Sequence, residues 1–197
     1  MTREKPTSIG IVVTGASGGL LALETLHLIQ RLKEDNPALE SHAIFTKGGK
    51  RTCALELSDV QRGALYSLPD KSYDDTNLAA PIASGSNTLD ALLFVPCSIR
   101  SLSAIAYSQT DRLSIRAADV MLKERRRLVL AVRESPLHAG HLQSMLTVSQ
   151  MGGIIAPPVP AFYLQPESVE DMAKQTAARL LMLLGLDLGE HMKRWEG

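Results

Sequence analysis

Two ionisable side chains, Arg133 and Glu134, directly follow a run of apolar and mostly branched residues at 128–132. A continuous apolar run of this length predicts a strand buried inside a parallel sheet. In open α/β sheets, ligands bind outside the carboxyl ends of the strands. We therefore expect this charged pair to lie where a ligand binds.

The residues before this strand, 116–127, predict a helix that carries Arg116, Lys123 and the arginines at 125–127. A solvated basic helix next to a charged strand end is the simplest alternative. This stretch alone does not decide between a binding site and that alternative.

Two strand–turn–helix junctions are the elements that would position such a site. Residues 9–13 predict a buried strand, followed by the small residues of a turn at 14–19. The helix after this turn presents an N-terminus that favours a phosphate or another electron-rich group, although a plain tight turn fits the sequence equally well. A second junction follows the apolar strand at 91–95. Two such junctions on neighbouring parallel strands would converge on one ligand.

Further candidates lie outside these junctions. The cluster Ser84-Gly85-Ser86 could offer N–H groups and hydroxyls to an anion, or cap the next helix. Tyr163 follows a stiff, proline-rich loop, which would hold it against a site or pack the loop down. Arg179 lies in an Ala/Leu-rich helix and needs a partner if it is buried.

Cysteine and histidine chemistry is not favoured. Cys97 lies at the second junction, but no histidine is near it in the sequence, so we prefer a packing role. His138 and His141 share a helix face without a third ligand, so no metal is expected.

Composition limits the possible function classes. The chain of 197 residues predicts a single domain over 1–197, with a short polar tail at 1–8. Acidic and basic residues balance at 21 each, which gives no overall attraction to nucleic acid or to an anionic membrane. No apolar run approaches the roughly 20 residues of a membrane span. The two cysteines show no CxxC spacing, and the polar N-terminus lacks the apolar core of a signal peptide, so we expect a cytoplasmic protein.

Strands and helices alternate along the sequence, which predicts a doubly wound parallel α/β sheet. The expected strands are 9–13, 41–46, 91–95, 128–132 and 152–156. The expected helices are 20–33, 51–57, 102–107, 116–127, 136–151 and 168–184, with a helix and a loop in 58–77.

Taken together in order, the motifs resemble those of the UbiX-type flavin prenyltransferases over nearly the whole chain, from about Ile9 to Trp195. The stretches that carry the resemblance are Thr14-Gly15-Ala16-Ser17-Gly18, Ala83-Ser84-Gly85-Ser86, Pro96-Cys97-Ser98, Arg116-Ala117-Ala118-Asp119-Val120, Leu122-Lys123-Glu124-Arg125-Arg126, Arg133-Glu134-Ser135-Pro136, His141-Leu142, and Pro160-Ala161-Phe162-Tyr163 with Pro166.

The resemblance implies a Rossmann-like, flavodoxin-like fold that assembles into a homo-oligomer, a dodecamer. It implies FMN as cofactor and dimethylallyl phosphate as prenyl donor. Such enzymes join the C5 unit to flavin N5 and close a ring onto C6 without a metal. Their product, prenylated FMN, is passed to a UbiD-type decarboxylase.

The resemblance also implies roles for individual residues. The flavin contacts are Gly15, Ala16, Ser17, Thr46, Ser98, Ile99, Arg100, Ser101 and Arg133. The contacts with the allyl phosphate are Gly85, Arg116, Lys123, Tyr163 and Arg179. The catalytic group comprises Glu134, Ser17, Glu56 and Lys123, with Glu134 as the acid that protonates the departing phosphate.

The sequence departs from the family pattern at a few positions. Leu78 stands where many members have an aromatic residue that shields an allyl cation, which leaves the preferred prenyl donor open. Ile99, Arg100 and Ser101 replace Met-Lys-Thr and keep the charge and the hydroxyl. Thr46 replaces serine and also keeps the hydroxyl.

Two other readings are compatible with parts of the sequence. An FMN-dependent cysteine decarboxylase has a similar first turn, but only part of its Pro-Ala-Ser-Ala-Asn-Thr stretch is matched at 83–88 and its Met-Asn-containing motif is missing. A non-catalytic flavin-binding subunit would not need the intact Lys123, Glu134, Tyr163 and Arg179.

Overall fold

The computed structural model describes residues 7–86 and 89–192. Its centre is a parallel sheet of six strands in the order β3-β2-β1-β4-β5-β6. The strands are β1 (Ser8–Val13), β2 (Glu40–Phe45), β3 (Lys71–Tyr73), β4 (Ala91–Cys97), β5 (Arg127–Val132) and β6 (Ile154–Ile155). This is the Rossmann strand order, and without the short edge strand β3 it becomes the flavodoxin order. The doubly wound fold expected from the sequence is confirmed.

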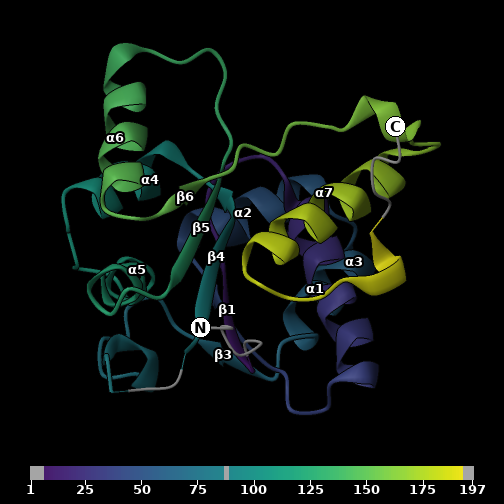
Figure 1. Ribbon diagram of the computed structural model, residues 1–197, viewed down its shortest axis with the longest axis horizontal. Helices are drawn as coiled ribbons and strands as arrows, with labels where there is room; N and C mark the ends of the chain where they lie inside the picture. Colours follow the sequence, from purple (N-terminus) through teal and green to yellow (C-terminus); the bar gives the residue numbers. More distant parts are fainter. Residues whose placement is uncertain (1–6, 87–88, 193–197) are drawn as a thin grey trace.

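Helices cover both faces of the sheet (Figure 1). They are α1 (Gly19–Asp35), α2 (Lys47–Glu56), α3 (Asp59–Ser67), α4 (Ile99–Ala106), α5 (Leu113–Lys123), α6 (Ala139–Gln150) and α7 (Val169–Leu183). Three short 3₁₀ turns lie at Pro81–Ala83, Phe162–Leu164 and Gly189–His191. One apolar core joins α1, α2, α3 and α7 to the sheet, and a second core on the other face joins α4, α5 and α6.

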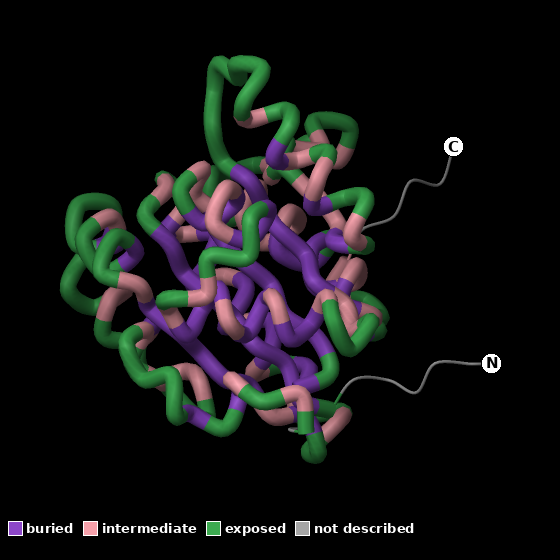
Figure 2. Tube along the Cα trace, turned by 90° about the vertical axis from the view of Figure 1, so that its left-hand side faces the viewer, coloured by how far each residue is buried: buried purple, intermediate pink, exposed green. Residues whose placement is uncertain are grey.

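The central strands β1, β4 and β5 are buried because nearly every residue in them is apolar. All residues of β1 and β4 are buried, as expected for strands covered by helices on both faces. Figure 2 shows these buried segments running through the middle of the molecule, with the exposed segments around them. The chain after β5 is exposed from Arg133 to Gly140 and projects beyond the carboxyl edge of the sheet.

Several predicted helix boundaries were wrong. The helix expected at 116–127 begins at Leu113 and ends at Lys123, because Arg125 adopts a left-handed conformation with φ of 57°. Arg127 therefore belongs to β5. The helix expected at 51–57 begins at Lys47, since Thr46 caps it by accepting a hydrogen bond from Gly49.

Other boundaries also moved. The helix expected at 102–107 begins at Ile99, and the one expected at 136–151 begins at Ala139. The strand expected at 152–156 contains only Ile154–Ile155, while β3 was not predicted. Ser168 caps the start of α7, because its hydroxyl accepts a hydrogen bond from the N–H of Asp171 at 3.0 Å. Trp195, at the end of the resemblance, lies outside the described residues, as do residues 87–88 of the partly matched decarboxylase stretch.

Candidate functional site

A cavity of about 920 Å³ opens at the carboxyl edge of the sheet. Every residue expected to contact the flavin lines it, together with Glu134. These residues are Gly15, Ala16, Ser17, Thr46, Ser98, Ile99, Arg100, Ser101 and Arg133. The two junctions therefore converge as predicted. They meet where β1 and β4 are neighbours, which is the topological switch point of the sheet.

Two glycines let the turns after β1 and β2 approach each other. A Cβ added to Gly15 would lie 3.1 Å from the Cα of Gly48, and the reverse holds for a Cβ on Gly48. Thr46 adds a polar link, because its N–H donates to the carbonyl of Val13 at 3.1 Å and its hydroxyl donates to the same oxygen at 3.2 Å. The walls of the cavity on these two strands are thus held together by backbone packing.

The N-terminus of α4 is suited to an anion. The Ser98 hydroxyl accepts a hydrogen bond from the N–H of Ser101 at 3.3 Å and lies 3.1 Å from the Ser101 hydroxyl. The first N–H groups of a helix lack partners within the helix, and its dipole favours negative charge at this end. Ser98 and Ser101 both line the cavity at this helix start, and helix starts of this kind bind phosphate groups.

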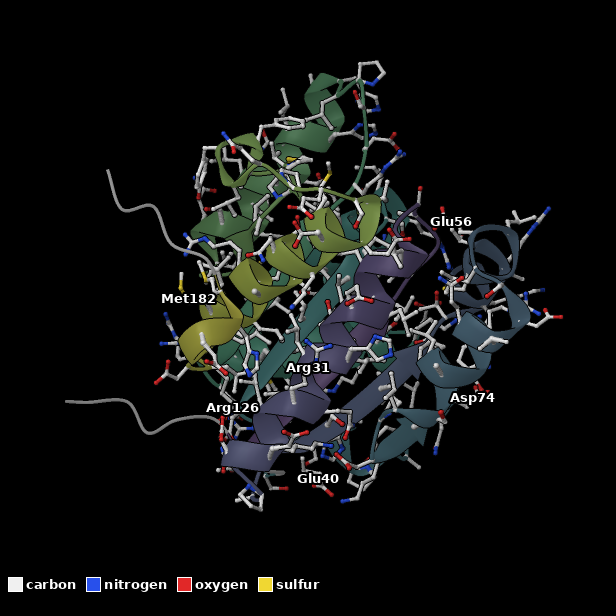
Figure 3. The ribbon with its side chains drawn as sticks, turned by 90° about the vertical axis from the view of Figure 1, so that its right-hand side faces the viewer. Arg31, Glu40, Glu56, Asp74, Arg126 and Met182 are labelled. Atoms are coloured by element: carbon white, nitrogen blue, oxygen red, sulfur yellow. The ribbon has the colours of Figure 1, made fainter. Side chains whose placement is uncertain are left out.

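The N-terminus of α1 is closed by a side chain. The Glu56 carboxylate accepts hydrogen bonds from the N–H groups of Gly18 at 2.9 Å and Gly19 at 2.7 Å. Figure 3 shows Glu56 beside the start of α1. Partial burial raises the pKa of the Glu56 carboxyl, but hydrogen bonds from Gly18, Gly19 and Ser17 outweigh burial and hold this pKa below its usual value. An electron-rich group does occupy this helix start, as one of the two alternatives expected, but it is the carboxylate of Glu56 and not a phosphate.

Arg133 and Glu134 line the cavity from the end of β5. The N–H of Arg133 donates to the carbonyl of Cys97 at 3.0 Å, which fixes this strand end against β4. The Glu134 carboxylate accepts a hydrogen bond from the N–H of Ser135 at 3.0 Å. Both side chains are exposed, so they can reach a bound molecule without prior rearrangement of the core.

Three of the residues expected to hold the allyl phosphate lie on α5 or beside it, away from the large cavity. A Cβ added to Gly85 would lie 2.6 Å from the Lys123 Nζ, so these two residues are neighbours. Arg116 donates to the carbonyl of Ala83 at 3.0 Å, which attaches the same loop to α5. Arg116 also pairs with Asp119 at 2.7 Å, and Lys123 pairs with Glu124.

Tyr163 and Arg179 lie elsewhere in the chain. They line a cavity of about 420 Å³ between β6, the proline-rich loop and α7. Arg179 is exposed, so it does not need the partner that burial would require. Because α7 and α5 belong to cores on opposite faces of the sheet, one chain does not bring the five phosphate residues together.

Sequence reasoning missed part of the cavity wall. The additional lining residues are Gly48, Asp75, Ser103, Ala104, Gln109, Asp111, Arg112, Ser114 and Ile115. Asp75 has a clear local role, because its carboxylate accepts from the N–H of Ser114 at 2.9 Å and its carbonyl accepts from the N–H of Leu113 at 2.8 Å. The residue at the N-cap of α5 is Arg112, whose side chain makes no capping hydrogen bond. A helix start without its own capping side chain needs an acceptor from another segment, and this requirement could have pointed to Asp75.

The structure supports a packing role for Cys97, which is fully buried. Burial raises the pKa of its thiol, which disfavours the reactive thiolate. The rings of His138 and His141 lie against each other with centroids 3.6 Å apart and planes tilted by 35°. Among residues 7–86 and 89–192, no cluster of three or more His, Cys, Asp or Glu side chains could hold a metal ion. In the same ranges, no helix is both long and apolar enough to cross a membrane.

Comparisons with known proteins place these features in context. The sequence profile of the Flavoprotein family matches residues 1–179. The flavin prenyltransferase UbiX of Archaeoglobus fulgidus is 43% identical over 185 residues, which cover 94% of this chain and 97% of the relative.

Two solved structures are similar over almost their full length. One is AnUbiX in complex with FMN and dimethylallyl pyrophosphate, with a TM-score of 0.90, 40% identity and coverage of 98% of this chain and 99% of that chain. The other is a dodecameric FMN-dependent UbiX-like decarboxylase from Escherichia coli O157:H7, with a TM-score of 0.88, 38% identity and coverage of 96% and 100%.

Proposed function

The chain belongs to the flavin prenyltransferase family of flavoproteins, and from this membership we propose that it transfers the dimethylallyl group of dimethylallyl phosphate to N5 and C6 of reduced FMN. The family resemblance expected from the sequence is confirmed. The observation that carries the proposal is the cavity of about 920 Å³, which is lined by every expected flavin contact and by Glu134. We further propose that the prenylated FMN serves a UbiD-type decarboxylase.

The residues of the cavity fit FMN. Its phosphate would lie at the N-terminus of α4, where Ser98 and Ser101 offer hydroxyls and the helix dipole is favourable. The start of α1 is not available, because the Glu56 carboxylate already accepts its N–H groups. When bound, reduced FMN supplies the nucleophilic N5 and C6 atoms that accept the prenyl group.

The residues around α5 fit the phosphate of the donor. Lys123 and Arg116 supply positive charge, which stabilises the negative charge left on phosphate as the allylic C–O bond breaks. Glu134 lies at the cavity on an exposed strand end, where it could pass a proton to the departing phosphate. Ser17 lies in the turn after β1, and the Glu56 carboxylate at the end of α2 accepts hydrogen bonds from this turn, next to the predicted flavin position.

A second copy of the chain would complete the donor site. Within one chain, Tyr163 and Arg179 lie on the face of the sheet opposite Lys123 and Arg116. A homo-oligomer, such as a dodecamer, could place Tyr163 and Arg179 of one copy against the α5 cations of its neighbour. The exposed apolar side chains of Val159 and Phe162, 74% and 71% accessible, lie beside Tyr163 and suit burial in such an interface.

The experiment that tests the proposal is an anaerobic incubation of the protein with reduced FMN and a prenyl donor, followed by mass spectrometry of the extracted flavin. We expect a flavin heavier by one C5 unit. Dimethylallyl phosphate and dimethylallyl pyrophosphate are tested in parallel, because the structure of AnUbiX contains the pyrophosphate. Unmodified flavin with both donors and with longer prenyl phosphates would overturn the proposal.

A cytoplasmic location and a single domain over the whole chain are also part of the proposal. Both cysteines are free and buried, which suits a reducing compartment.

A further inference from the structure

Thr14 connects the two junctions from beneath the cavity. Its side chain is almost fully buried, with 1% of its surface accessible. The Thr14 hydroxyl donates a hydrogen bond to the carbonyl of Pro96 at 2.8 Å and accepts one from the N–H of Ser98 at 2.7 Å. One hydroxyl at the end of β1 therefore holds both sides of the turn between β4 and α4.

This connection fixes the start of α4. The N–H of Ser98 points down to Thr14, while the Ser98 hydroxyl accepts from the N–H of Ser101 and caps the helix. The N–H groups of the first helical turn have no intrahelical partners. With the cap held in this orientation, the N–H groups of Ile99 and Arg100 and the two serine hydroxyls remain at the wall of the cavity.

We propose that Thr14 is a positioning residue for the phosphate of FMN, an inference that rests on the proposed function. Thr14 holds the start of α4 in register with the turn at Gly15, so that the phosphate and the flavin ring can be bound at the same time. A side chain of equal size without the hydroxyl leaves the partly buried N–H of Ser98 without its acceptor, and the cap is free to reorient.

The test compares two flavins that differ only in the phosphate. FMN and riboflavin are titrated against the wild-type protein, Thr14→Val and Thr14→Ser, and binding is measured by flavin fluorescence. We expect Thr14→Val to raise the Kd for FMN by about tenfold or more, while the Kd for riboflavin stays within about twofold of the wild type. Thr14→Ser restores the hydroxyl and should bind FMN as the wild type does.

Thr25→Val is the matched control. The Thr25 hydroxyl is also fully buried and donates to a backbone carbonyl at 2.8 Å, but it lies inside α1, away from the cavity. This variant also replaces a buried threonine hydroxyl by a methyl group, but at a distance from the cavity, so it should bind FMN as the wild type does.

The outcomes separate the two proposals. Wild-type protein that binds neither flavin would refute the proposed function itself. Wild-type protein that binds FMN and riboflavin equally would show that no phosphate lies at α4 and would overturn the role of Thr14. Equal loss of both flavins in Thr14→Val would also overturn it, since the hydroxyl would then support the whole cavity. Unchanged FMN binding in a folded Thr14→Val variant would have the same effect.

Discussion

Gly49 in α2 packs so closely on β1 that a Cβ added to it would lie 2.2 Å from the carbonyl oxygen of Val13. That oxygen also accepts hydrogen bonds from Thr46. We expect Gly49→Ala to lower the free energy of unfolding by at least about 2 kcal/mol, because α2 must move away from a backbone group that cannot yield.

Gly63→Ala provides the control for Gly49→Ala. Gly63 also lies inside a helix, α3, but a Cβ there meets no atom within 4 Å. The free energy of unfolding of this variant should rise by about 0.5–1 kcal/mol, because alanine reduces the backbone entropy of the unfolded chain. Urea unfolding measures both variants, and equal stability of the two would contradict the close packing between α2 and β1.

The Glu56 carboxylate should make a pH-dependent contribution to stability. Its pKa is lowered in the folded protein, so the ionised group stabilises the folded state above the unfolded value near 4.5. This contribution to stability is lost as the pH falls through the lower pKa that Glu56 has in the folded protein. Glu56→Gln should therefore lower the free energy of unfolding by about 0.5–1 kcal/mol at pH 7, as expected for the loss of a charge at an exposed helix N-terminus. The difference in stability from the wild type should shrink below pH 4.5.

Glu167→Gln serves as the control for Glu56→Gln, since Glu167 is an exposed carboxylate in the loop before α7. Unfolding by urea at several pH values gives both comparisons. A Glu56→Gln deficit that stays constant from pH 7 to pH 3 would argue against a charge at the start of α1.

Glu134→Gln should impair prenyl transfer without loss of FMN. The amide keeps the size of the side chain but cannot donate an acidic proton, so we expect the rate of transfer to fall by about 10²–10⁴-fold. Anaerobic turnover and flavin titration measure the two effects separately. Loss of bound flavin in this variant would contradict the assigned role.

Leu78→Trp should change the choice of prenyl donor more than the affinity for flavin. Leu78 is 47% exposed and follows the loop that caps α5, so a larger ring can be accommodated. An aromatic face at this position would stabilise a developing allyl cation. Competition between donors of different chain length gives the measurement, and an unchanged donor ratio would rule the effect out.

Lys123→Ala and Arg179→Ala should rescue each other when co-expressed. Each variant alone should be nearly inactive, because each lacks one cation for the donor phosphate. If a site takes Lys123 from one copy and Arg179 from another, random assembly leaves about a quarter of the sites intact. Activity of the mixed oligomer is compared with that of the double variant, and no recovery would show that both residues act from the same copy.

Much of the fold could be predicted because the buried strands are almost purely apolar. The runs at 9–13, 91–95 and 128–132 identified three central strands, and their alternation with helices gave a parallel sheet. Strand β3 was missed because Lys71 and Ser72 are exposed and only pairing with β2 defines the strand. The end of α5 was missed because Arg125 adopts a left-handed conformation, which its residue type does not signal.

The site was predictable in part for a similar reason. Residues next to strand ends share one edge of a parallel sheet, so Gly15, Ser98 and Arg133 were expected together and lie around one cavity. Spacing along the chain does not show which face of the sheet a later helix covers. For that reason the separation of Lys123 from Arg179 was not foreseen, and neither was the reach of Glu56 to the start of α1.

The closed start of α1 also determines which nucleotides the sheet can accept. In dinucleotide-binding proteins of the same strand order, a pyrophosphate rests on the N-terminus of the first helix. Here the carboxylate of Glu56 holds that position and repels a second anion. We therefore expect the first junction to disfavour the pyrophosphate of a nicotinamide dinucleotide, while the proposed site for the FMN phosphate at the start of α4 is unaffected. The chain thus combines a strand order shared with dehydrogenases with a carboxylate at the position where their cofactors place a pyrophosphate.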